Sequence, residues 1–264
     1  MIYIKDKIKN KIKDWEESSI CVVTDFDRTI TSGDSNSSWG VISKSNLVSK
    51  QYLKDRTDLY NYYRPIEIDE NLDYVEKNKL MIEWWNKHIE LFKKYKFTKE
   101  IIDEVASDTE AMILRTGSKE FLKKLYEKNI PVIIISAGIG NFIETFLRKN
   151  NCYYQNIIII SNFIKFENKI AVGILGNVIH SLNKDKIFVS NKINNIIENR
   201  KNVILLGDSI SDIKMIKEEL RNNALKIGFL EENIDENFKY YQNEFDIVCT
   251  NNTGYDELIS KILI

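Results

Sequence analysis

The sequence predicts an α/β fold in which a parallel β-sheet is flanked by helices and a helical insert follows the first strand. Short apolar runs rich in β-branched residues recur along the chain, and each has the length of a fully buried strand. Segments with helical periodicity separate most of these runs, and such alternation is typical of a parallel sheet covered on both faces. One long stretch, from about Thr31 to Thr116, holds helical patterns without a strand-like run.

The predicted core elements follow from these patterns. The predicted strands are the apolar runs Ile20–Thr24, Pro131–Ile135, Ile157–Ile160, Val203–Leu206, Leu225–Gly228 and Ile247–Cys249. The predicted helices, which share a helical spacing of apolar residues, are Lys119–Lys128, Gly140–Lys149, Ser190–Asn199, Ser211–Leu220 and Tyr255–Leu263. The segment Ile164–Ile179 has Glu167-Asn168 between two extended stretches, which predicts a β-hairpin that leaves the sheet.

The insert is predicted to be helical at Val41–Lys54, Asn78–Lys96 and Lys99–Ser107, and the apolar residues of the second segment fall on one helical face. The chain has only two prolines and no Gly/Ser-rich linker. We therefore predict a core formed by residues 1–31 and 117–264, joined by two short hinges to a cap formed by residues 32–116.

The overall charge excludes some partners. The 264 residues include 38 basic and 39 acidic side chains, for a net charge of −1. No global field favours a nucleic-acid polymer or an anionic membrane, so we expect neither as a partner.

The N-terminus lacks a continuous apolar signal segment, and no apolar run approaches a membrane span. With three widely spaced cysteines, expected to be free, this predicts a cytoplasmic protein, and we expect a monomer.

Acidic side chains follow two of the predicted strands. Asp25 and Asp27 come directly after the first strand, and Asp208 and Asp212 follow the fourth. Such residues either form a solvated acidic turn or line the edge where parallel sheets bind ligands. If the two strands are neighbours, Asp25, Asp27 and Asp208 converge, and the group takes up protons or binds a hard cation, for which Mg²⁺ fits best. Asp212 either joins the group or occupies a first helical turn.

Two further segments point to anion binding. Ser136 follows another strand and leads through Gly138 into a helix, where a hydroxyl and backbone N–H groups form an anion cradle. A dinucleotide fingerprint is disfavoured because Ile143 stands at its third glycine position and no acidic residue follows the next strand. Lys184 is either a surface lysine or, beside a phosphate and the carboxylates, the group that neutralises transition-state charge.

These motifs, in this order, resemble those of the haloacid dehalogenase (HAD) superfamily: DFDRT (Asp25–Thr29), ISAG (Ile135–Gly138), Lys184 and GDSISD (Gly207–Asp212). SAGIGNFIE, HSLNK, VILLGDSISDIKM and the cap segments YYRPIEID (Tyr62–Asp69) and MIEWWNKH (Met81–His88) are similar to the cytosolic pyrimidine 5′-nucleotidase family, type III. The similarity extends over residues 20–262. It implies a Rossmann-like core with a helical cap, and hydrolysis of nucleoside 5′-monophosphates.

The resemblance implies a role for each matching residue. Asp25 resembles the nucleophile, Asp27 the general acid/base, and Lys184 the catalytic cation. The implied metal group is Asp25, Asp208 and Asp212 with Asp27, which acts through its backbone carbonyl. The implied phosphate-binding residues are Ser136, Ala137, Gly138 and Thr29.

The implied base pocket contains Glu67, which matches the glutamate that reads the nucleobase. Trp84 either stacks on the base or belongs to the cap core, and His88 either lines the pocket or is a satisfied cap histidine. The chain departs from the family in three places. His88 aligns with a small hydroxyl residue of the family, and Arg28 replaces an apolar residue. The segment Ser32–Tyr60 shows little resemblance to the family. Arg28 either touches phosphate or cap, or lies on the surface. These departures bear on the substrate and not on the phosphatase chemistry.

We therefore predict a Mg²⁺-dependent phosphomonoesterase that forms an aspartyl-phosphate and hydrolyses nucleoside 5′-monophosphates, with a preference for pyrimidines. One alternative is a phosphatase for another small phosphomonoester such as phosphoserine. Another is a phosphotransferase, because an aspartyl-phosphate can also pass to an acceptor hydroxyl. A non-catalytic Mg²⁺- and phosphate-binding protein would lack a nucleophile or an acid, and both Asp25 and Asp27 are present.

Overall fold

A central eight-stranded sheet organises the computed structural model, which describes residues 1–6, 8–69, 71–108, 110–185 and 191–262. The strands are β1 (Ile2–Ile4), β2 (Ile20–Thr24), β3 (Val132–Ile139), β4 (Ile157–Glu167), β5 (Ile170–Leu175), β6 (Asn202–Gly207), β7 (Leu225–Leu230) and β8 (Ile247–Thr250). Their order in the sheet is β1-β8-β7-β6-β2-β3-β4-β5. The two edge strands β1 and β5 are antiparallel to their neighbours, and the six strands between them are parallel.

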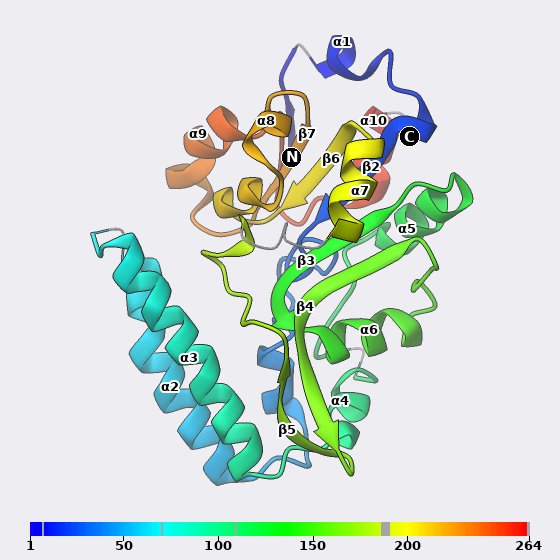
Figure 1. The fold of residues 1–264 in the computed structure, drawn as a ribbon. Coiled ribbons are helices and arrows are strands. Elements are labelled where there is room, and N and C mark those ends of the chain that lie inside the picture. Colours follow the sequence, from blue (N-terminus) through cyan, green and yellow to red (C-terminus); the bar gives the residue numbers. More distant parts are fainter. Residues whose placement is uncertain (7, 70, 109, 186–190, 263–264) are drawn as a thin grey trace.

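The helices surround this sheet (Figure 1). The α-helices are α1 (Ile8–Ile12), α2 (Lys50–Ile68), α3 (Tyr74–Lys94), α4 (Lys99–Val105), α5 (Ser118–Glu127), α6 (Gly140–Lys149), α7 (Asn191–Asn199), α8 (Glu218–Arg221), α9 (Ile234–Glu244) and α10 (Tyr255–Ile262). Short 3₁₀ helices in the described residues include η1 (Glu17–Ser19), η2 (Gly40–Lys44) and η4 (Ile210–Met215). None of the helices in the described ranges is long and apolar enough to cross a membrane.

Alternate residues of the parallel strands feed two separate hydrophobic cores, one on each face of the sheet. In β2, Val22 belongs to the core that α5, α6 and α10 cover, whereas Cys21 and Val23 belong to the core on the other face. The period of two in a strand explains this division. All five residues of β2 are buried, as expected for a strand that is covered on both faces. The predicted α/β fold is confirmed.

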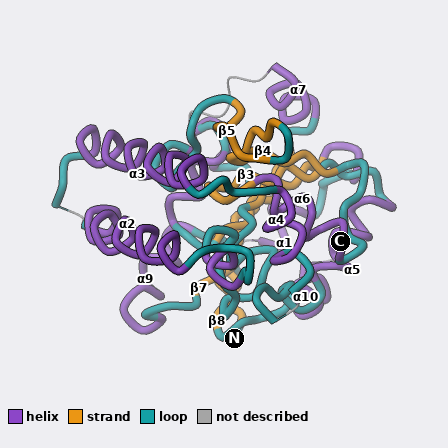
Figure 2. The backbone as a smooth tube through the Cα atoms, turned by 90° about the horizontal axis from the view of Figure 1, so that it is seen from below, coloured by secondary structure: helices purple, strands orange, loops and turns teal. Residues whose placement is uncertain are grey.

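The hairpin predicted for Ile164–Ile179 is formed by β4 and β5, which pair from Phe163 with Leu175 to Glu167 with Ile170. The turn residues Asn168 and Lys169 have φ values of 47° and 68°, which suit the twist of a two-residue hairpin loop. The hairpin extends beyond the rest of the sheet, and α3 lies against β5 (Figures 1 and 2). It therefore supports the helix pair of the insert.

The insert leaves and re-enters the core through two adjacent segments. Thr31 forms an antiparallel bridge with Leu114, and the Ser32 N–H donates to the Ile113 carbonyl at 2.8 Å. Between these points α2 and α3 form an antiparallel pair beside the sheet (Figures 1 and 2).

The helix predicted at Val41–Lys54 is wrong. Val41 and Ile42 are buried in the short helix η2, and α2 begins only at Lys50. The Ser49 hydroxyl caps α2 by accepting the Tyr52 N–H at 3.1 Å. Serine side chains compete for backbone N–H groups and favour a break in the helix at this point.

The helix predicted at Ser211–Leu220 is also wrong, because it divides into η4 and α8. Ser209 and Asp212 form a capping box that starts η4, and Ile216 is extended with φ −126°.

Strand β3 runs past the predicted end at Ile135 to Ile139. The elements β1, α1 and α9 were not predicted, and the ends of two predicted helices, Ser190 and Leu263, lie outside the described residues.

Candidate active site

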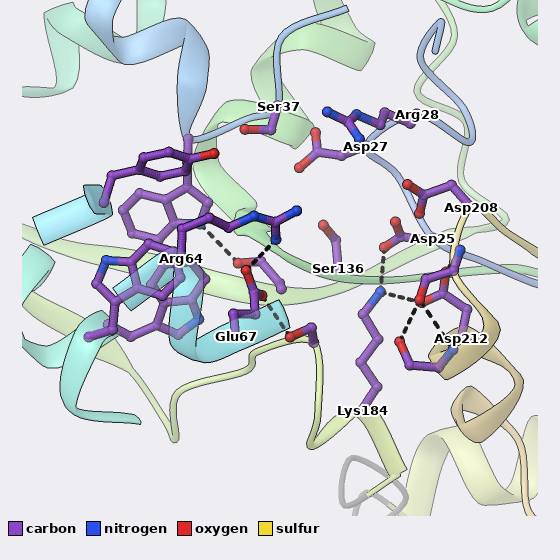
Figure 3. A pocket seen from close by; sticks show the side chains of 18 of the residues that line it. Asp25, Asp27, Arg28, Ser37, Arg64, Glu67, Ser136, Lys184, Asp208 and Asp212 are labelled. Carbon is purple, nitrogen blue, oxygen red and sulfur yellow. Dashed lines mark hydrogen bonds and ion pairs between the residues drawn. The ribbon is translucent and has the colours of Figure 1, made fainter. Parts of the chain in front are cut away.

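A cavity of about 390 Å³ lies at the carboxyl edge of the sheet, and both the sheet edge and helices α2 and α3 contribute to its lining (Figure 3). Strands β2 and β6 are parallel neighbours, with Thr24 opposite Leu206. Because they end at the same edge, Asp25 and Asp208 emerge side by side and line the cavity. The prediction that the carboxylates converge required the two strands to be neighbours, and β2 and β6 are neighbours.

Lys184 lies among the carboxylates. Its Nζ is 2.7 Å from Asp25 Oδ1 and 2.7 Å from Asp212 Oδ1 (Figure 3). Lys184 and Asp25 are each 5% exposed, and Asp212 is 1% exposed. The second oxygen of Asp212 accepts the Ser209 N–H at 3.0 Å. Asp212 therefore combines the two predicted roles, since it caps a helical turn and joins the carboxylate group.

Burial dominates the electrostatics of this group. Burial raises the pKa of Asp25 to about 7, Lys184 opposes this rise, and Asp212 and Asp27 add to it. Burial, with the charges of Asp212 and Asp25, also raises the pKa of Asp208 well above its usual range. Burial favours neutral Lys184, but Asp212 and Asp25 outweigh this effect and raise its pKa, so the lysine stays charged.

The carboxylates form a group that suits a metal ion. One oxygen from each of Asp25, Asp208 and Asp212 lies within 4.8 Å of the other two. The single charge of Lys184 does not balance three carboxylates, of which Asp25 and Asp212 are buried and Asp208 is half-buried. Burial is the main cause of the raised pKa of Asp25, and the charges of Asp212 and Asp27 add to it. A donor set made only of carboxylate oxygens fits a hard divalent cation such as Mg²⁺.

We expect the metal-free protein to lose stability as the pH rises from about 4 to about 7. In the unfolded chain Asp25 ionises near pH 4, whereas in the folded chain it keeps its proton up to about pH 7. The folded state therefore binds more protons over this window, so the free energy of unfolding falls as the pH rises. Thermal unfolding in chelator should show a shallower pH slope for Asp25→Asn. Identical slopes would contradict the assignment.

The Asp27 carboxylate is hydrogen-bonded to Ser38, whereas Lys184 is bonded to Asp25 and Asp212. One oxygen of Asp27 accepts the Ser38 N–H and the other accepts the Ser38 hydroxyl, both at 2.8 Å. Burial raises the pKa of Asp27, and the two bonds from Ser38 lower it in part. The carboxylate is thus directed by the insert and not by Lys184.

Not all of the predicted phosphate-binding residues reach the cavity. Ser136 and Ala137 line it, but Thr29 and Gly138 are absent from its lining. Thr29 Oγ1 is buried without a hydrogen-bond partner. The Gly138 N–H donates to Ser136 Oγ at 3.0 Å. The phosphate-binding role of Thr29 and Gly138 stays a prediction.

The far side of the cavity is aromatic. Trp84, Trp85 and His88 of α3 line it together with Trp39 and Tyr60. Trp39 stacks on Trp85 with ring centroids 4.8 Å apart. Burial lowers the pKa of His88 to about 3, aided by Arg56, so the imidazole is neutral. Both His88 Nδ1 and Trp84 Nε1 are buried without a partner.

Glu67 lies at the junction of the two sides of the cavity (Figure 3). Its Oε2 is 2.5 Å from Arg64 Nη1, and its Oε1 accepts the Ser181 hydroxyl at 2.9 Å. Ser181 precedes Lys184 by three positions, so the carboxylate contacts the loop that carries the lysine.

Sequence reasoning missed Ser38, Trp39, Arg64 and Ser181. Ser38 and Trp39 lie in the segment with the least family resemblance, and no local pattern marks them. Arg64 could have been found, because it stands three residues before Glu67 on one helix face.

Arg28 lines the cavity and is 2.7 Å from Glu232, with 38% of its side chain exposed.

Comparison with known proteins places this geometry in a family. The family model described as Pyrimidine 5′-nucleotidase (UMPH-1) matches residues 24–263. The chain belongs to the pyrimidine 5′-nucleotidase family. The 7-methylguanosine phosphate-specific 5′-nucleotidase of Homo sapiens is 37% identical over 243 residues, which is 89% of this chain and 81% of the relative. Its counterpart in Drosophila melanogaster is 34% identical over 245 residues, which is 89% and 76% of the two chains.

Solved structures agree with this assignment. The structure of cytosolic 5′-nucleotidase IIIB bound to cytidine has a TM-score of 0.87 at 31% identity, and the match covers 97% of this chain and 91% of that one. A substrate-bound phosphoserine phosphatase shares the fold, with a TM-score of 0.59 at 18% identity over 94% of this chain and 100% of that one. The predicted family and the predicted class, a phosphoric monoester hydrolase of the 5′-nucleotidase type, are confirmed.

Proposed function

We propose that this member of the pyrimidine 5′-nucleotidase family is a Mg²⁺-dependent nucleoside 5′-monophosphate phosphohydrolase, with residues 32–116 as its cap. The observation that supports this most strongly is the arrangement of one cavity. Asp25, paired with Lys184, lies on one side, and the tryptophans of the insert lie on the other. A phosphate monoester with a planar base spans these two sides.

Asp25 is the nucleophile in this proposal. Its carboxylate oxygen forms a bond to phosphorus while the bond to the ester oxygen breaks, which leaves an aspartyl-phosphate. Asp27 donates a proton to the departing ester oxygen, then takes a proton from the water that attacks the aspartyl-phosphate. Inorganic phosphate leaves and the Asp25 carboxylate is restored. When bound at Asp25, Asp208 and Asp212, Mg²⁺ would offset the repulsion between the carboxylate and the phosphate.

The remaining residues stabilise the phosphate. Lys184 supplies a fixed positive charge beside Asp25. Ser136 Oγ accepts the Gly138 N–H through a lone pair, so its own proton is available for a phosphate oxygen. The metal role predicted for the Asp27 carbonyl stays a prediction.

Base selection rests on Glu67 and the aromatic residues. A carboxylate can accept the exocyclic amine of cytosine, which supports the predicted pyrimidine preference. A second candidate base is 7-methylguanine, for which two of the relatives are named. Its ring carries a positive charge, and tryptophan faces such as those of Trp39 and Trp84 attract cations. Glu67 would accept its N–H donors.

A substrate panel tests the proposal. Phosphate release would be measured with Mg²⁺ from CMP, UMP, GMP, 7-methylguanosine 5′-monophosphate and phosphoserine, with Asp25→Asn as the blank. A lead for CMP or UMP supports the pyrimidine candidate. Since GMP differs only by the methyl group and its charge, equal rates for the two guanine nucleotides would rule out the cationic base. A lead for phosphoserine would overturn the nucleotide assignment.

Glu67→Gln is expected to raise KM for the preferred nucleotide about tenfold, because a charge-assisted hydrogen bond to the base is lost. The KM for phosphoserine should change little. Glu83→Gln is the matched control, since Glu83 lies on α3 and bonds to Tyr63 outside the cavity lining. An equal effect on both substrates would mean that Glu67 does not contact the base.

Ser38→Ala is expected to lower kcat roughly tenfold with little change in KM. The substitution removes the hydroxyl bond to Asp27 Oδ2, and a hydrogen bond to a charged group contributes about 1.5–3 kcal/mol. Ser43→Ala is the control, because Ser43 donates only to the Gly40 carbonyl in the same segment. Steady-state kinetics on the best substrate of the panel decide the outcome, and an unchanged kcat would argue against a directing role for Ser38.

Three further properties stay predictions: transfer of the phosphoryl group to an acceptor hydroxyl, a cytoplasmic location and a monomeric state. The first would be detected as a phosphorylated acceptor when alcohols or nucleosides are added to the reaction.

A further inference from the structure

The residue after Asp27 has an unusual backbone conformation. Arg28 has φ 59°, in the left-handed region that side chains with a β-carbon rarely occupy. A residue keeps such a conformation only where its surroundings hold it. Because Arg28 directly follows Asp27, its φ angle determines how the chain turns after the carboxylate.

Arg115 contacts the carbonyl groups of this turn. Its Nη2 donates to the Arg28 carbonyl, and its Nε donates to the Thr29 carbonyl at 3.1 Å. Arg115 is only 1% exposed and is not part of the cavity lining. It therefore acts on the turn from behind, without access to a substrate.

The guanidinium is itself held from the opposite side. Arg115 Nη1 lies 2.7 Å from Glu231 Oε1, and it also donates to the side chain of Asn252 and the carbonyl of Thr253. Its centre lies 4.2 Å from the ring centroid of Phe229. These partners lie in β7 or just after β7 and β8. The turn is thus tied to the ends of two strands.

Arg115 also belongs to the segment through which the chain returns from the insert. Its N–H donates to the Ile30 carbonyl at 3.0 Å, next to the bridge between Thr31 and Leu114. One residue therefore connects the turn after Asp27, the hinge and the sheet.

We propose that Arg115 is a positioning residue for phosphoryl transfer, because it holds Arg28 in the left-handed conformation that directs Asp27. The inference rests on the general acid/base role proposed for Asp27. In the alternative, Arg115 is a buried ion-pair partner that stabilises the fold only.

Arg115→Lys separates the two roles. Lysine keeps the charge and can pair with Glu231, but it lacks the fork of donors that reaches both carbonyls at the same time. We expect kcat to fall about 100-fold, the usual effect of a small misplacement in an active site, with little change in KM. Thermal unfolding and circular dichroism establish that the variant is folded.

Substitutions of Arg28 provide the decisive test. Arg28→Gly and Arg28→Ala both remove the side chain, but only glycine adopts a positive φ without strain. With Arg115 intact, the two variants should have similar kcat values. In the Arg115→Lys background Arg28→Gly should be faster than Arg28→Ala, by roughly tenfold, because glycine no longer needs the guanidinium. A role in stability alone would leave the ratio of the two kcat values the same in both backgrounds and overturn the inference.

Two further variants keep the test conclusive. If Arg115→Lys does not fold, Glu231→Gln replaces it, since it loosens the guanidinium without removing it, and the same ratio is measured. Asp27→Asn is assayed in parallel. If Asp27→Asn keeps the wild-type kcat, the proposed mechanism fails. If it is inactive and the ratio of the two kcat values does not change, only the role of Arg115 fails.

Discussion

Asp25→Asn is expected to lower kcat about 10⁴-fold or more, because an amide cannot form the aspartyl-phosphate and loss of a nucleophile costs about this much in other hydrolases. The fold should survive. Burial already raises the pKa of Asp25 to about 7, so a neutral side chain suits the site, and Lys184 keeps its bond to Asp212.

The measurement is phosphate release from the best substrate of the panel, together with the thermal unfolding temperature. Asp58→Asn is the matched control, since Asp58 is an exposed aspartate of α2. A second observation separates chemistry from binding, because the variant should still bind the nucleotide. If Asp25→Asn keeps a substantial part of the wild-type rate, Asp25 is not the nucleophile.

Lys184→Met is expected to lower kcat about 10³-fold, in line with the loss of one group that stabilises transition-state charge. A second effect is on the pH profile. Lys184 lowers the pKa of Asp25, so its removal raises that pKa and shifts the rise in rate to higher pH. Methionine preserves most of the volume of the lysine, which limits repacking of the site.

Stability offers an independent readout for the same variant. Removing one partner of a buried ion pair costs about 3–5 kcal/mol when the other partner stays charged. The Asp25 carboxylate can take up a proton at low pH, so the loss in unfolding temperature should be smaller at low pH than at high pH. The control is Lys165→Met, which removes an exposed lysine 2.8 Å from Glu167. A wild-type kcat for Lys184→Met would contradict its assigned role.

Much of the fold could be predicted because local patterns determine it. The run Ile20–Thr24 is apolar at every position except the last, and it became a strand that is buried on both faces. Glu167-Asn168 indicated the turn of a hairpin, and the structure has one there. Strand β1 could not be predicted, since three residues form a strand only where β8 offers a partner.

Helix α9 was also missed, and the omission affects the site. Its Tyr241 donates from its hydroxyl to the Asp208 carbonyl at 2.5 Å, a contact between segments far apart in the chain. Ser38 with Asp27 and Arg115 with Arg28 are contacts of the same kind. No periodicity within a segment reports on such pairs.

By itself the sequence determined which residues could carry the chemistry, because apolar runs that end in aspartate place carboxylates at strand ends. Asp25, Asp208 and Lys184 followed from this pattern and from the family motifs. Only the tertiary structure decided that Asp212 completes the carboxylate group, whereas the Asp27 carboxylate is bonded to Ser38. The direction of a side chain depends on how distant segments pack around it, and that packing exists only in the folded chain.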